Sequence, residues 1–155
     1  MVEIREMKPG EEGLLMDLMK QQPEMELLTL EHTDSIYFFL DNQQLDGFLV
    51  FRPVNQQAVI LLALETARDH WNVQDGLMRA GFNALCQQRI SWVFAETNMV
   101  KRLLVLTEHF HSIHECSADL KALSDSESLF SSGDWKAAES KAIFRGACKG
   151  ASDAR

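Results

Sequence analysis

Hydrophobic and polar residues in the first part of the chain follow the periods of strands and helices in turn. Residues 2–6 alternate apolar and charged side chains, which is typical of a strand with one buried face. Between 11 and 22, apolar residues recur on one helical face, and glutamates stand at the start, where they complement the helix dipole. Strand-forming runs follow over 35–40, 45–52 and 58–64. The pattern predicts a strand, a helix and then a three-stranded antiparallel meander.

The second part of the chain predicts a strand–helix–strand unit. The apolar run 58–64 is followed by a helical pattern over 73–87 and by a second apolar run over 90–95. Gly81 lies within the helical pattern, where it lets the helix approach the sheet closely. A further amphipathic pattern predicts a helix over 98–110. Weaker signals predict the remaining elements: a short helix over 24–31, an exposed loop over 124–134, and strands over 111–120 and 142–147.

Composition narrows the class of protein. The 155 residues suit one domain, expected over 1–148, with a small polar tail over 149–155 that we expect to be flexible. The acidic net charge of −8 argues against nucleic-acid binding, which needs a basic surface. No apolar run approaches the roughly 20 residues that span a bilayer, and the first residues lack the apolar centre of a secretory signal. These features predict a soluble, cytoplasmic protein without membrane association.

The order of the predicted elements and a few spaced residues point to a known fold. An acidic helix follows the dipeptide Ile4-Arg5, and Asn98 is followed at fixed offsets by Val105, His109 and Phe110. These features resemble the Gcn5-related N-acetyltransferase (GNAT) family. At the positions of Asn98, Val105, His109 and Phe110, many of its members carry Asn, Tyr, Gly and Phe. Asn98 and Phe110 match. The resemblance implies an α/β fold, or α+β by a stricter usage: a GNAT-like mixed twisted sheet of six to seven strands flanked by helices.

Two functional elements of that family are missing from the sequence. Val105 stands where the family carries the tyrosine that protonates the departing thiolate of coenzyme A, and valine cannot donate a proton. Counted from Arg68, Trp71 and Val73 stand where the family carries the glycines that let a loop cradle the pyrophosphate of acetyl-CoA. Asp69 in the same stretch would repel a phosphate. The sequence therefore predicts no cofactor or, if the domain is an enzyme, acetyl-CoA.

Glu65 is the candidate catalytic residue. It follows the apolar run 58–64, where some GNAT enzymes hold the base that deprotonates the acceptor amine. The alternative is a solvated carboxylate, or one that caps the next helix, and this structural interpretation is favoured. If acetyl-CoA binds, the resemblance implies contacts from a set of residues around the loop and the following helix: Arg68, Val73, Gln74, Asp75 and Asn98.

Two other groups of residues have both a functional and a structural interpretation. His109, His111 and His114 are the densest potential metal ligands, and the first two would share one side of an extended strand. No second ligand pair with a recognisable spacing accompanies them, so we predict no metal site. Trp71 could stack on a ligand or could cover the core as an aromatic cap, and we favour the cap.

Two functions of different classes remain. The first is a pseudoenzyme: a GNAT-like domain that has lost acetyl-CoA-dependent catalysis and acts as a structural or regulatory protein bound to a protein partner. Degenerate GNAT-like domains of this kind occur among bacteriophage virion and accessory proteins, so a virion-associated location is the alternative to the cytoplasm. The second is a divergent acyl-CoA-dependent N-acetyltransferase with Glu65 as general base. The sequence leaves open whether the chain forms a homo-oligomer.

Overall fold

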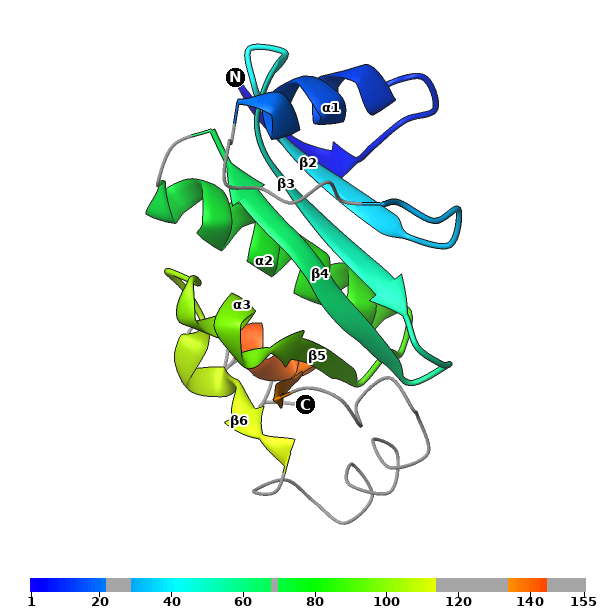
Figure 1. The fold of residues 1–155 in the computed structure, drawn as a ribbon, viewed down its shortest axis with the longest axis vertical. Coiled ribbons are helices and arrows are strands. Elements are labelled where there is room, and N and C mark those ends of the chain that lie inside the picture. The colour runs from blue at the N-terminus through cyan, green and yellow to red at the C-terminus, as the bar shows by residue number, and fades with distance from the viewer. Residues whose placement is uncertain (22–28, 68–69, 114–133, 145–155) are drawn as a thin grey trace.

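The computed structural model describes residues 1–21, 29–67, 70–113 and 134–144. In these residues the chain forms a seven-stranded mixed sheet in the order β1-β2-β3-β4-β5-β7-β6, flanked by helices (Figure 1). The strands are β1 (Val2–Glu6), β2 (Ser35–Asp41), β3 (Gln44–Pro53), β4 (Ala58–Thr66), β5 (Trp92–Glu96), β6 (His111–Ser112) and β7 (Trp135–Glu139). The helices are α1 (Glu12–Lys20), α2 (Trp71–Gln87) and α3 (Thr97–Lys101), with the short 3-10 helices η1 (Thr107–His109) and η4 (Ser140–Phe144). The predicted mixed sheet of six to seven strands is confirmed.

Some predicted segments lie outside the described residues. They are residues 24–28 of the short helix, residues 124–133 of the loop, and the tail over 149–155. Residues 29–31, the rest of the predicted short helix, are not helical. None of the helices in the described part of the chain is long and apolar enough to cross a membrane.

The antiparallel half of the sheet, β1 to β4, follows the sequence pattern closely. Each of these strands pairs with the next along the chain. The loop between β2 and β3 turns at Asn42 and Gln43, whose φ angles are 49° and 69°. Two successive residues in the left-handed region are what a type I′ hairpin turn requires, and asparagine tolerates this region better than glutamine does.

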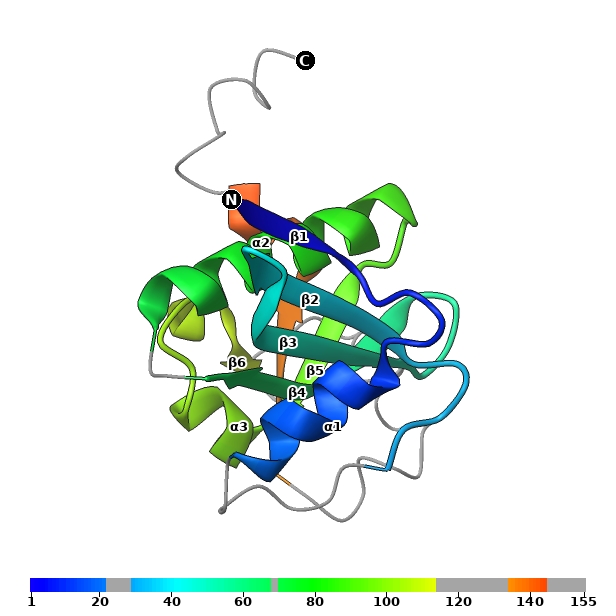
Figure 2. The ribbon, with the colours of Figure 1, turned by 90° about the horizontal axis from the view of Figure 1, so that it is seen from above.

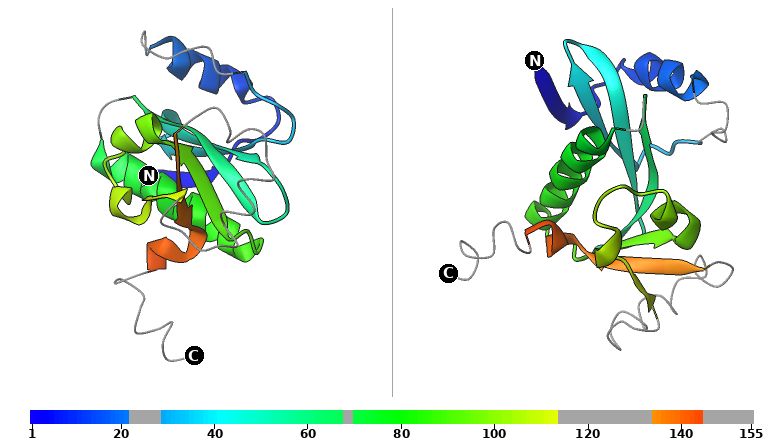
Figure 3. Two further views of the ribbon diagram at one scale, coloured as in Figure 1. Left: turned by 60° about the horizontal axis from the view of Figure 1, so that its bottom comes forward. Right: turned by 90° about the vertical axis from the view of Figure 1, so that its left-hand side faces the viewer.

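Helices α1 and α2 cover opposite faces of this half of the sheet, as Figure 2 and the right panel of Figure 3 show. α2 packs on the larger core cluster, which includes Leu49, Phe51 and Phe82. At Gly81 a Cβ atom would overlap the side chains of Leu49 and Phe51, which confirms that glycine lets α2 approach the sheet. α1 buries three apolar side chains against the other face: Leu15, Leu18 and Met19.

β4 and β5 are parallel, and they separate after a short paired stretch. Their register covers only residues 58–60 of β4 against 92–94 of β5. On its other side β4 stays paired with β3 as far as Thr66. β5 therefore does not pair with β4 beyond Ile60. Figure 1 shows the two strands diverging toward α3.

A β-bulge lies in β4 just beyond the point where β5 leaves it. Val50 of β3 lies opposite Ala63, whereas the next residue, Phe51, lies opposite Leu61. Leu62 is thus an extra residue on β4. A bulge of this kind shifts the alternation of side chains, so that residues after it exchange faces relative to an unbroken strand.

The predicted helix over 98–110 is wrong beyond its first turn. α3 is only 5 residues long, and a loop leads from it to η1. In this loop Leu103 and Val105 are buried, Leu104 is 47% exposed, and Leu106 has a φ of 60°. The four consecutive apolar residues 103–106 cannot share one face of a helix, whereas an extended segment can bury every second residue. Burial of alternate residues therefore ends the helix.

The last part of the sheet also differs from the prediction. β7 pairs with β5 and with β6, although its residues (W-K-A-A-E) include few strand formers. The predicted strand over 142–147 is wrong in its described part, because residues 140–144 form η4. The predicted strand over 111–120 begins at its expected residue as β6 but ends at Ser112, because residue 113 is in a 3-10 turn; residues 114–120 lie outside the described ones. Packing rather than propensity selects β7, since Ala137 and Ala138 are each 1% exposed.

Candidate functional site

Glu65 lies near the end of β4, beyond the last residue that pairs with β5. Because of the bulge, Leu64 joins the core cluster under α2, and Glu65 turns to the α1 face, opposite Phe48 of β3. The Glu65 side chain is 19% exposed. The carboxylate therefore stands half-buried at the part of the β4 edge that β5 leaves unpaired.

Arg102 reaches Glu65 from the other side of this separation. It directly follows α3, and its Nη2 donates a hydrogen bond to Oε1 of Glu65 at 3.0 Å. Burial raises the pKa of Glu65 above its ordinary value, and the charge and hydrogen bond of Arg102 offset part of that rise. The arginine side chain is 62% exposed, so solvent screens the ion pair. Sequence reasoning missed this contact because it joins residues 37 positions apart, with no local signal.

The first turn of α2 does not form a phosphate cradle in its described residues. Trp71 is 58% exposed, so the expectation that it caps the core is wrong, and Val73 is 3% exposed within the core. The side-chain Oε1 of Gln74 accepts a hydrogen bond from the N–H of Leu104 at 2.9 Å. The two positions that glycine would hold in the family therefore carry an exposed indole and a core side chain. The described residues do not fit the pyrophosphate of acetyl-CoA in the family's manner.

The other residues predicted to contact a cofactor are dispersed. Asp75 is engaged by Arg79 one turn later on α2, with Nε 3.0 Å from Oδ1. Asn98 is exposed on α3, and Arg68 lies outside the described residues. What the structure does bring together is Glu65 and Gln74, because both hold the same short segment, residues 102–104. This segment links the end of β4 to the first turn of α2.

No proton donor equivalent to the family's tyrosine stands beside Glu65 among the described residues. Val105, at the corresponding sequence position, is 6% exposed. Tyr37, the chain's only tyrosine, lies on the α2 face of the sheet, and its hydroxyl donates to Oε1 of Glu6 at 3.3 Å. Burial raises the pKa of Tyr37 to about 12, with the Glu6 carboxylate adding to the effect. Because Glu65 points to the α1 face, Tyr37 cannot act on the same substrate atom.

The histidines near η1 do not assemble a metal centre in the described residues. His109 belongs to η1 and His111 to β6, so they do not share a strand as the sequence interpretation required. His114 lies outside the described residues. Within the described ranges no group of three or more His, Cys, Asp or Glu side chains could hold a metal ion.

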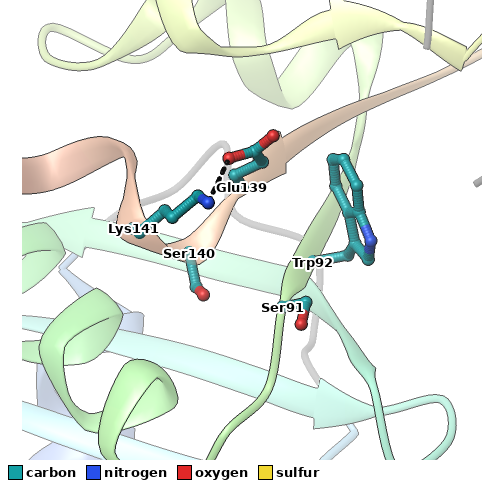
Figure 4. A pocket seen from close by; sticks show the side chains of 5 residues that line it. All are labelled: Ser91, Trp92, Glu139, Ser140 and Lys141. Atoms are coloured by element: carbon teal, nitrogen blue, oxygen red, sulfur yellow. Dashed lines mark ion pairs between the residues drawn. The ribbon is translucent and has the colours of Figure 1, made fainter. Parts of the chain in front are cut away.

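A cavity of about 280 Å³ opens at the far end of β5. It is lined by Ser91, Trp92, Glu139, Ser140 and Lys141 (Figure 4). Nζ of Lys141 lies 3.7 Å from Oε2 of Glu139, so its charged groups already neutralise each other. β5 runs from this cavity to α3, and Glu65 stands by the α3 end. The cavity is thus separate from the candidate site.

Comparison by sequence finds nothing: no family model matches the chain, and no curated protein does. Comparison of the fold finds acetyltransferases. Tetrahymena GCN5 superposes with a TM-score of 0.64 at 16% identity, over 88% of this chain and 95% of that one. A GNAT-family acetyltransferase from Staphylococcus aureus has a TM-score of 0.64 at 12% identity, over 91% of this chain and 100% of that one.

A third similar structure is N-acetylglutamate synthase from Neisseria gonorrhoeae, complexed with coenzyme A and N-acetyl-glutamate. It superposes with a TM-score of 0.62 at 12% identity, over 90% of this chain and 35% of that one. The chain therefore spans about a third of the synthase. At such identities the likeness concerns the fold, and the fold of this chain is that of the Gcn5-related N-acetyltransferase family, as the sequence predicts.

Proposed function

We propose that this domain keeps the GNAT fold without acetyl transfer and acts as a structural or regulatory protein that binds a protein partner. One observation carries the proposal. The helix after β5, which in the family carries the acid tyrosine, ends here after 5 residues, and Val105 is 6% exposed in the core. The position that carries the proton-donating tyrosine in the family therefore holds a buried side chain that cannot protonate a leaving thiolate.

Two neighbouring features support the same conclusion. The first turn of α2 carries Trp71 and Val73 where a pyrophosphate would need glycines, and Gln74 uses its side chain to hold Leu104. Glu65 is bonded to Arg102, so its carboxylate has a partner before any amine arrives. Both contacts fasten the segment 102–104 across the start of α2 and the end of β4.

Titration calorimetry of the purified full chain with acetyl-CoA, and separately with coenzyme A, tests this proposal. We expect no saturable heat up to about 1 mM ligand. Circular dichroism of the same sample establishes that the protein is folded. A saturable site of micromolar affinity would overturn the loss of cofactor binding and move the domain to the enzyme class.

A second function, a divergent acyltransferase with Glu65 as general base, is favoured by one specific observation. Burial raises the pKa of Glu65, and the carboxylate stands at the open edge of β4. A carboxylate with a raised pKa is a better proton acceptor for an attacking amine than an ordinary one. In this case Glu65→Gln abolishes thiol release from acetyl-CoA, and the rate of wild type falls as pH drops through the pKa of Glu65.

Arg102→Gln tests the role of the ion pair in either case. Arg102 lowers the pKa of Glu65 against the effect of burial, so removing the guanidinium shifts the Glu65 titration to higher pH. NMR titration of the Glu65 carboxyl carbon measures this shift. Lys101→Gln, which removes a neighbouring exposed cation, is the matched control and should leave the titration in place. A titration unchanged in Arg102→Gln would show that the ion pair does not govern the carboxylate.

A further inference from the structure

β1 is an edge strand. It pairs with β2 over residues 2–6, and in the described part of the chain no strand pairs with its other side. Figure 2 shows β1 at the margin of the sheet, next to β2. An edge strand presents a row of unpaired N–H and C=O groups, which is a template for another strand.

Backbone bonds at the two ends of β1 establish which of its residues face outward. The N–H of Met7 donates to the carbonyl of Ile36 at 2.9 Å, and the carbonyl of Met1 accepts from the N–H of Asn42 at 3.0 Å. Alternate residues of an antiparallel strand direct both backbone groups to the same side. Odd-numbered residues of β1 therefore bond to β2. The residues whose N–H and C=O point away from β2 are Val2, Ile4 and Glu6.

We propose that β1 pairs in antiparallel fashion with β1 of a second copy of this chain, centred on Ile4. In this register Ile4 lies opposite Ile4 of the second copy, and Val2 lies opposite Glu6. All outward backbone groups then find partners, and the two sheets join into one. A register displaced by a single residue in one strand would set outward groups against inward ones and leave them unpaired.

The charges of β1 select the same register. Glu3 and Arg5 alternate with Ile4, which packs on the α2 side, so both lie on the α1 face. Centring on Ile4 sets Glu3 opposite Arg5 of the second copy twice, in the type of pair where side chains are closest. Centring on Glu3 or on Arg5 would set like charges opposite each other. Of these three registers, only the Ile4-centred one pairs every outward backbone group and also sets Glu3 opposite Arg5.

Arg5 is already held at this edge. Its guanidinium bonds to Glu11 through Nη1 and Nη2, both at 2.8 Å, and Nη1 also donates to the carbonyl of Glu6 at 2.9 Å. Its Nε lies 2.8 Å from Oε1 of Glu3, whose side chain is 59% exposed. In the dimer the carbonyl of Glu6 accepts from the second copy's Val2 instead, and the Glu11 contact remains. Val2, 53% exposed in the single chain, is then covered.

The inference goes beyond the proposed function, because it holds whether or not the domain binds acetyl-CoA. Sedimentation equilibrium of the full chain, with any purification tag at the C-terminus, tests it. We expect a concentration-dependent dimer whose dissociation constant rises at least about tenfold in Glu3→Lys, since the introduced ammonium group would face Arg5 twice. Asp17→Lys, the same charge change on the exposed side of α1, is the control and leaves the dimer intact.

Two further variants make the test specific to this register. Arg5→Glu alone sets glutamates opposite each other, but a mixture of Glu3→Lys with Arg5→Glu chains restores opposite charges and yields a heterodimer. Val2→Pro removes an outward N–H without touching the bonds to β2, and it also weakens the dimer. By NMR, the amides of Val2, Ile4 and Glu6 gain protection from exchange as concentration rises. A chain that stays monomeric to about 1 mM, or a dimer unaffected by Glu3→Lys and Val2→Pro, would overturn the proposal.

Discussion

The two halves of the sheet are held in different ways. In β1 to β4 each strand pairs with its neighbour over much of its length, and helices bury both faces. β5, β7 and β6 join that half through a three-residue register with β4 and through side chains that cross between the halves. In the β1–β4 half, the local sequence pattern decides the structure. In the β5–β7–β6 half, contacts between distant residues decide it, and the sequence pattern is a poorer guide.

Phe82→Ala should have the largest effect, because Phe82 touches both halves. Its ring is fully buried, with ring centroids 6.1 Å from Phe51 of β3 and 6.5 Å from Phe110 beyond η1. We expect a loss of about 3–5 kcal/mol in the free energy of unfolding. Urea denaturation measures it, with Leu14→Ala on the exposed side of α1 as the control of small effect. A loss below about 1 kcal/mol would mean that the halves do not share this core.

Arg52→Met probes the antiparallel half alone. The carboxylate of Asp34, 0% exposed, accepts from Nε and Nη2 of Arg52 at 2.8 and 2.9 Å and from the N–H of Glu31 at 2.8 Å. Without Arg52 the charged Asp34 carboxylate stays buried, with the Glu31 N–H as its one remaining donor. We therefore expect a loss of about 2–4 kcal/mol in the free energy of unfolding at neutral pH. Denaturation at pH 7 measures the loss. Arg79→Met, which removes the less buried Arg79–Asp75 pair on α2, is the matched control of smaller effect.

The same pair predicts a pH dependence. Burial alone raises the pKa of Asp34, but the hydrogen bonds and charge of Arg52 and the Glu31 N–H outweigh it, so the pKa lies below the ordinary 3.8. The stabilisation from this group is therefore complete above pH 3.8 and is lost as pH falls through the lower folded-state pKa. The loss of unfolding free energy in Arg52→Met, relative to wild type, should therefore become smaller as the pH falls into the acid range. A deficit that stays constant from pH 7 down to acid unfolding would contradict the ion pair as its cause.

Gln43→Gly should have the smallest effect and the opposite sign. Gln43 has a φ of 69° in the β2–β3 turn, where glycine carries no steric cost, so we expect a gain of about 0.5–1 kcal/mol. Leu106, with a φ of 60°, has the same strain in the second half, but its side chain also packs on the core. Leu106→Gly should therefore not stabilise the protein. Thermal unfolding compares Gln43→Gly with Leu106→Gly. An equal gain in stability in both variants would contradict this difference between the halves.

The same contrast explains what the sequence could predict. β1 alternates apolar and charged residues, and β2 to β4 are runs of strand-forming apolar residues, so these strands were predictable from nearby residues. α2 was predictable for the same reason, including the close approach at Gly81. The family resemblance then supplied the order of the elements, and the fold comparison supports it.

The remainder depends on contacts that no local pattern encodes. α3 ends early because Leu103 and Val105 are buried in alternation and Gln74 captures the N–H of Leu104. β7 forms because β5 and β6 lie on either side of it, not because Trp135–Glu139 favours a strand. At the candidate site, the position of Glu65 at the end of its strand was predictable. Its half-burial and its arginine partner were not.

The extra residue in β4 places Glu65 on the face of the sheet where the candidate site lies. Because the bulge absorbs Leu62, Leu64 enters the core beneath α2 and Glu65 emerges on the opposite side. If Leu62 paired with Val50 instead, every later residue of β4 would move one place along β3. Glu65 would then lie opposite Gly47, and its carboxylate would be buried among the apolar side chains beneath α2. The number of β4 residues that precede Glu65 sets the face on which its side chain lies. That number therefore decides whether the carboxylate contacts solvent and Arg102.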